Sequence, residues 1–174
     1  KGFSPNVSNK HLSWDGIQIG IKEFNIAREN FADKTGFWPK MTWFVRADSQ
    51  IKLLYKNPGY CLENFEKTWE KLKKNNDEIA WHPHLYFWDK DHESWNQKID
   101  DDSYTLNCLE EGYQAFDTFW SESPKSVHGG WGYQNNTTFK FYSDVGITSD
   151  CSAMPGHNTL NLGLHDKSDW YETK

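Results

Sequence analysis

The chain has 174 residues and a formal net charge of −6, and it shows no basic stripe, which argues against a nucleic-acid partner. Its length is sufficient for a hydrophobic core, so we expect a single domain over residues 1–174. No signal peptide is visible and no apolar run approaches transmembrane length, so we expect no membrane insertion. Cys61, Cys108 and Cys151 cannot all pair and lack C-x-x-C spacing, which favours a reducing compartment, the cytoplasm.

Helical and strand patterns alternate along the first half of the chain. Apolar residues at helical spacing predict a helix over residues 21–31, and the β-prone run 41–45 predicts a buried strand. Residues 62–72 again have helical spacing, and the apolar run 79–81 predicts a second strand.

The second half continues this alternation. The acidic segment 89–102 predicts a mobile loop, and the segments that follow predict, in order, a helix over 104–120, a strand over 126–128, a helix over 137–144 and a strand that begins at 145–148 and ends at Asp150. Alternating strands and helices are typical of an α/β fold with a parallel sheet.

In parallel α/β folds the functional groups gather where the strands end. The residues at the predicted strand ends are Asp48, His82, His84, His128 and Asp150. Each can bind a metal ion or transfer a proton, and we therefore expect a site at this edge of the sheet.

The two histidines are the strongest of these signals. Pro83 separates them and prevents the strand from continuing its hydrogen-bond ladder, so both imidazoles follow the buried run 79–81 where it leaves the sheet. Neutral imidazoles placed together are ready metal ligands or proton-transfer groups.

Four ordered segments resemble the polysaccharide deacetylase (NodB-homology) family, and more closely its members encoded with surface-polysaccharide genes. Residues 41–45 (MTWFV) look like the family's second strand, A-T-F-F-V, and residues 77–82 (DEIAWH) look like H-E-I-G-x-H. Residues 126–132 (SVHGGWG) lie where the family has R-x-P-[YW]-G, and residues 146–152 (GITSDCS) are similar to G-F-x-x-D-S-S. The resemblance covers roughly residues 17–155.

The resemblance implies a distorted (β/α) barrel of parallel strands and a hydrolase that removes N- or O-acetyl groups from a glycan. In this family one Asp and two His hold a divalent metal ion, often zinc, a second Asp acts as base, and a later His acts as acid. For this chain it implies His82, His84 and Asp15 as metal ligands and Asp48, His128 and Asp150 as catalytic residues. Aromatic faces stack on sugar rings, so Trp131 and Tyr133 are expected to bind the substrate.

The chain departs from the family's pattern in four places. The family's second ligand at i+4 from His82 is replaced by Tyr86, so we expect His84 to serve instead. The paired aspartates of the first motif have Asp15 as their nearest candidate, with a position before Lys1 as the alternative, and the third motif's Arg is replaced by His128. The family's final segments are not recognisable before Lys174, so the chain looks shorter than a complete domain.

These departures leave two other hypotheses open. One is a glycan-binding or structural relative that kept the barrel and lost the chemistry. The other is an amidohydrolase-like metal enzyme, in which an H-x-H motif ends the first strand; here the motif follows an earlier strand, which counts against it.

Overall fold

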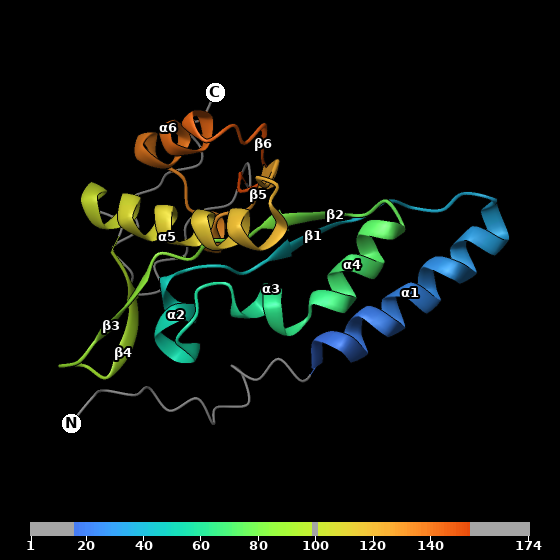
Figure 1. Cartoon of the computed structure of the whole chain (residues 1–174), viewed down its shortest axis with the longest axis horizontal. Helices are drawn as coiled ribbons and strands as arrows, with labels where there is room; N and C mark the ends of the chain where they lie inside the picture. Colours follow the sequence, from blue (N-terminus) through green and yellow to red (C-terminus); the bar gives the residue numbers. More distant parts are fainter. Residues whose placement is uncertain (1–15, 99–100, 154–174) are drawn as a thin grey trace.

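A computed structural model describes residues 16–98 and 101–153, which form a mixed α/β fold around a parallel sheet (Figure 1). The strands, in their order across the sheet, are β1 (Thr42–Val45), β2 (Glu78–Trp81), β5 (Ser126–Val127) and β6 (Ser149–Asp150). All three neighbouring pairs are parallel. The predicted parallel α/β architecture is therefore confirmed.

The register of the sheet brings the strand ends into one row. Val45 lies opposite Trp81, Trp81 opposite Val127, and Val127 opposite Asp150. Because parallel strands end at the same edge, the residues that follow these positions emerge side by side. This register places the predicted site residues close together.

Six α-helices and one 3-10 turn connect the described strands. They are α1 (Gly16–Thr35), α2 (Ser49–Tyr55), α3 (Tyr60–Asn64), α4 (Glu66–Lys74), α5 (Asp102–Trp120), η2 (Gly130–Gly132) and α6 (Asn136–Asp144). In the view of Figure 1, α1, α3 and α4 lie below β1 and β2, whereas α6 lies above them. None of the helices in the described residues combines the length and the hydropathy that a membrane span requires.

The core is centred on Trp81 of β2, which is fully buried. Its ring makes edge or tilted contacts with Tyr113 of α5 and with Phe141 and Tyr142 of α6, and its Nε1 donates a hydrogen bond of 2.9 Å to the Ala47 carbonyl. These contacts fix α5 and α6 against the strand that leads to the histidines.

A buried ion pair attaches α1 to the sheet. The Arg28 guanidinium donates to both oxygens of Asp77 at 2.7 Å, and Trp43 Nε1 donates to Oδ2 at 2.9 Å. Burial raises the pKa of Asp77, but the hydrogen bonds from Arg28 and Trp43 outweigh it and hold the pKa below its usual value. The carboxylate therefore stays ionised beneath β1 and β2.

The structure corrects several sequence predictions. The segment predicted as a loop contains the second strand of a hairpin, in which β3 (Tyr86–Asp89) pairs antiparallel with β4 (Ser94–Gln97). Trp88 and Trp95 lie opposite each other in this hairpin and pack edge to face. This cross-strand contact stabilises the hairpin in a segment whose acidic composition predicts a loop.

Other corrections concern boundaries. The prediction of one helix over 62–72 is wrong, because Phe65 leaves the helical conformation between α3 and α4. Helix α2 was not predicted at all. The last strand is confined to Ser149 and Asp150 rather than beginning at 145–148, because Gly146 takes a φ of 79° after α6 ends.

Candidate functional site

The site is built around His82 and His84 at the carboxyl end of β2. The backbone N–H of His82 donates to the Val45 carbonyl at 2.9 Å, so this residue still follows the ladder with β1. Pro83 then ends the strand, and the two rings meet perpendicular to each other with their Nε2 atoms 3.0 Å apart. The H-P-H sequence thus brings two ring nitrogens to one point.

The contact at the other nitrogen fixes the tautomer of His82. Its Nδ1 lies 2.5 Å from the backbone carbonyl of His128, which can only accept, so Nδ1 carries the proton. The lone pair of Nε2 therefore faces His84. A backbone carbonyl that orients a ring in this way is a common partner of metal-ligating histidines.

The distance between the two nitrogens is compatible with a shared ion. Two nitrogens bound to tetrahedral zinc at about 2.0–2.1 Å lie about 3.3 Å from each other. The observed 3.0 Å needs only a small adjustment of either ring. Without an ion, the same geometry is a hydrogen bond from His84 Nε2 to His82 Nε2.

Both imidazoles are held neutral. Burial is the largest cause and lowers the pKa of His82 to about 4 and that of His84 to about 2, with Arg46 lowering both further. Neutral imidazole is the form that binds metal ions, so the pair is competent at neutral pH.

The ring of His84 is held between two neighbours. On one side the ring of Tyr86 is stacked on it, with centroids 5.1 Å apart. On another side Gly130 approaches so closely that a Cβ there would lie 2.3 Å from His84 Nδ1. The Gly130 N–H also donates to the Pro83 carbonyl at 2.8 Å, which fixes the glycine turn against the H-P-H segment.

Asp48 follows β1 and is fully buried. Its Oδ1 accepts from Ile51 N at 2.9 Å and caps α2. Its Oδ2 accepts two hydrogen bonds from Arg46, at 2.7 and 2.9 Å, and one from the backbone of His84 at 3.3 Å. Asp48 is therefore well placed to hold the His84 segment, and its carboxylate is already occupied by donors.

Asp150 is the last residue of β6, and His128 directly follows the neighbouring strand β5. Oδ1 of Asp150 accepts from the Ser152 hydroxyl at 2.5 Å, and that hydroxyl accepts from Gly129 N at 2.6 Å. Among the described residues, Asp150 Oδ2 and His128 Nδ1 are buried without a hydrogen-bond partner. His84 Nδ1 is likewise buried without a partner in the described part of the chain. Such unsatisfied polar atoms are costly, and all three are able to exchange a proton with a ligand.

The two predicted substrate-binding aromatics differ in exposure. Trp131 is 57 % exposed, takes a φ of 58°, and its Nε1 donates to the hydroxyl of Tyr86. Tyr133, by contrast, is only 6 % exposed, and its hydroxyl accepts from Asn135 at 2.7 Å. Asp15 lies outside the described residues.

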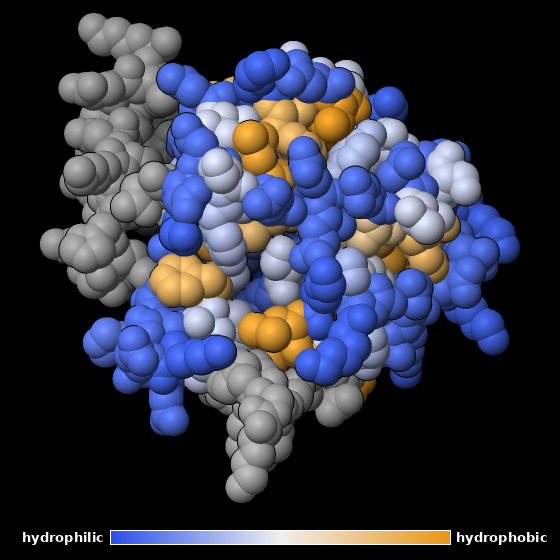
Figure 2. Space-filling view, turned by 60° about the vertical axis from the view of Figure 1, so that its left-hand side comes forward, coloured by the Kyte–Doolittle hydropathy of each residue, from blue (hydrophilic) through white to orange (hydrophobic). Residues whose placement is uncertain are grey.

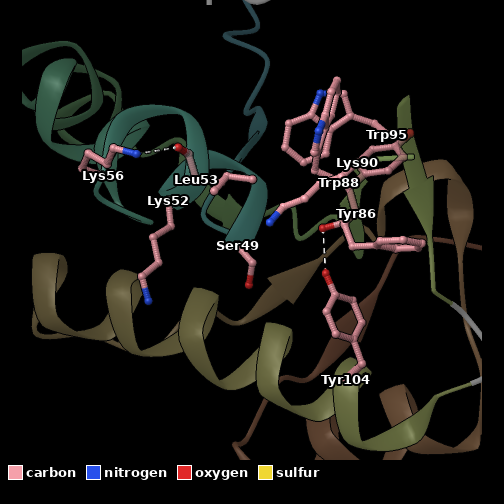
Figure 3. Close-up of a pocket in the computed structure, with 10 residues that line it drawn as sticks. Ser49, Lys52, Leu53, Lys56, Tyr86, Trp88, Lys90, Trp95 and Tyr104 are labelled. Atoms are coloured by element: carbon pink, nitrogen blue, oxygen red, sulfur yellow. Dashed lines mark hydrogen bonds between the residues drawn. The ribbon is translucent and has the colours of Figure 1, made fainter. Parts of the chain in front are cut away.

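A pocket of about 560 Å³ shares Tyr86 with the surroundings of His84 and was not predicted from the sequence (Figure 3). It lies between α2 and the β3–β4 hairpin, and Ser49 and Tyr86 connect it to Asp48 and His84. The signal that could have revealed it is the aromatic run at Tyr86, Phe87 and Trp88 with Trp95 beyond the turn, which is typical of a hairpin rather than of a loop.

Within residues 16–98 and 101–153, no group of three or more His, Cys, Asp or Glu side chains is arranged to hold a metal ion. The histidine pair thus supplies two ligands in the described part of the chain. Comparison of the sequence with protein-family models and curated proteins, and of the structure with solved structures, found no match.

Proposed function

We propose that the chain is a metal-dependent hydrolase that removes acetyl groups from an N- or O-acetylated glycan, on a fold related to the distorted (β/α) barrel. The observation that carries the proposal is the convergence of His82 Nε2 and His84 Nε2, 3.0 Å apart, at the carboxyl end of a parallel strand. Sites at this edge of a parallel sheet are the general rule in α/β enzymes.

His82 and His84 would hold a divalent ion, for which we propose zinc, with Asp15 as the third protein ligand. Such an ion supplies Lewis-acid chemistry, because it polarises an acetyl carbonyl and makes water more acidic. The neutral state of both imidazoles and the carbonyl contact of His82 Nδ1 support this assignment.

The proton transfers are assigned to the residues beside the pair. Asp150 Oδ2 has no hydrogen-bond donor among the described residues, so it can accept a proton from water. His128, whose ring centroid is 5.2 Å from that of His82, can return a proton to the departing sugar amine or hydroxyl. Asp48 would orient His84 through its backbone N–H and thereby support the site.

The first experiment is metal content and acetate release, measured on wild type and on the His82→Ala/His84→Ala double variant. We expect near-stoichiometric zinc and acetate release from acetylated oligosaccharides in wild type, and the loss of both in the double variant. His92→Ala is the matched control, because His92 is an exposed histidine of the hairpin turn that pairs with Asp89. An active preparation whose activity survives His82→Ala would refute the proposal.

A second candidate is a glycan-binding relative without catalysis. The observation that favours it is the occupied carboxylate of Asp48, whose oxygens already accept hydrogen bonds from Arg46, Ile51 and His84. This candidate predicts glycan binding with no metal-dependent release of acetate, which the same assay would detect.

A further inference from the structure

The pocket between α2 and the β3–β4 hairpin has an aromatic wall. Five of its lining residues are aromatic: Tyr86, Phe87, Trp88, Trp95 and Tyr104. The Tyr104 hydroxyl donates to the Tyr86 carbonyl at 2.8 Å, and Trp88 packs edge to face on Trp95, so the wall is held in place (Figure 3). Its volume of about 560 Å³ falls in the usual range for small-molecule sites.

The charged residues of the same pocket are all cationic. Lys52 and Lys56 line it from α2, and Lys90 reaches across from the hairpin toward α2 (Figure 3). Among the described residues, no Asp or Glu lines the pocket. This is a marked local departure in a chain whose net charge is −6.

The lysines differ in how far they are already neutralised. Lys52 pairs with Glu111 of α5. Lys56 donates to the backbone carbonyl of Leu53 at 3.3 Å, and neither Lys56 nor Lys90 forms an ion pair with another described residue. Two ammonium groups are therefore available to a ligand from opposite walls of the pocket.

The lining of the pocket combines aromatic side chains with lysines. Figure 2 turns the left-hand side of Figure 1 forward and shows apolar surface in small separate patches enclosed by hydrophilic residues. An aromatic wall with cationic groups at its rim suits a ligand that has both an apolar face and a negative charge.

We propose that this pocket binds a saccharide unit with an anionic substituent, a carboxylate or a sulfate, as part of the glycan that the histidine site acts on. The sugar ring packs on the aromatic wall, and its anionic group lies between Lys56 and Lys90. Tyr86 links the two places, since it lines the pocket and its ring is stacked on His84. This inference rests on the proposed function insofar as it takes the ligand to be a glycan.

The test is the binding of three oligosaccharides to the full chain, measured by calorimetry and by the fluorescence of its tryptophans. The three are a uronate oligomer, a sulfated oligomer and a neutral N-acetylglucosamine oligomer of the same length. We expect one or both anionic oligomers to bind at least threefold more tightly than the neutral one, and their affinity to fall as salt is raised. The two anionic oligomers distinguish carboxylate from sulfate.

Charge-removing variants locate the binding site. Lys56→Gln/Lys90→Gln is expected to weaken anionic binding by about three- to tenfold, since an exposed charge contact contributes about 0.2–1 kcal/mol. The matched control is Lys140→Gln, because Lys140 is an exposed lysine of α6 that pairs with Asp144. Equal binding of the neutral oligomer, or unchanged anionic binding in the double variant, would overturn the inference.

The same titration on His82→Ala/His84→Ala separates this inference from the proposed function. Anionic binding retained in that variant, with no acetate release by wild type, would support the pocket and refute the deacetylase. Acetate release by wild type with no preference for anionic oligomers would do the reverse.

Discussion

The substitution Gly130→Ala perturbs the histidine pair without altering either histidine. A methyl group at this position would lie 2.3 Å from His84 Nδ1, 2.5 Å from Cγ and 2.6 Å from Cε1. Ordinary van der Waals contact begins near 3.4 Å, so the ring must move by about 1 Å. Tyr86 is stacked on the His84 ring and restricts that movement.

Two effects of this movement can be estimated. Overpacking costs about 1–3 kcal/mol, which exceeds the gain of about 0.4–1 kcal/mol from removing a glycine, so we expect the free energy of unfolding to fall by about 1–2 kcal/mol. A ligand displaced by about 1 Å binds its ion poorly, so we expect zinc affinity to fall by about 10- to 100-fold.

Urea unfolding and zinc titration against a chelator measure the two effects separately. Gly20→Ala is the matched control, because Gly20 lies exposed within α1 and a Cβ there would meet nothing within 4 Å. We expect this control to stabilise the helix by about 0.5–1 kcal/mol and to leave zinc affinity unchanged. If Gly130→Ala instead behaved like Gly20→Ala in both measurements, the close packing of Gly130 against His84 would be refuted.

Two further predictions concern stability. Arg28→Met leaves the Asp77 carboxylate buried without its partner and is expected to lower the free energy of unfolding, measured with urea, by about 3–5 kcal/mol. Lys140→Met, which removes an exposed ion pair, should lower it by less than about 1 kcal/mol. Equal effects of the two substitutions would contradict a buried role for Arg28. His82 has its pKa lowered from 6.5 to about 4 by burial, so between these values the unfolded chain takes up a proton that the folded chain does not. The contribution of neutral His82 to stability is therefore complete above pH 6.5. As the pH falls from 6.5 to 5, the free energy of unfolding should decrease by roughly 1 kcal/mol per pH unit because of this residue. A His82→Gln variant whose free energy of unfolding varies with pH as steeply as that of wild type would contradict this assignment.

Local sequence patterns were enough to predict where the strands of the parallel sheet end. The runs 41–45, 79–81 and 126–128 each carry enough β-branched or aromatic residues to predict a strand, and alternation with helices predicts a parallel sheet. Parallel strands end at one edge, so Asp48, His82, His128 and Asp150 were expected to be neighbours. The register aligns the ends of β2, β5 and β6, and a hydrogen bond from His84 N reaches Asp48. Such inferences need only local pattern and a rule of topology.

The chemical state of these neighbouring residues depends on contacts that the fold creates. Whether Asp48 is free or occupied depends on the rotamer of Arg46 and the start of α2, which periodicity does not encode. The tautomer of His82 depends on a carbonyl 46 residues further along the chain. The pocket depends on a hairpin that folds back toward α2, because the pairing of Trp88 with Trp95 stabilises a segment whose acidic composition alone predicts a loop. In each case long-range contacts set the protonation, occupancy or position of a side chain, and these are properties that no local window of sequence contains.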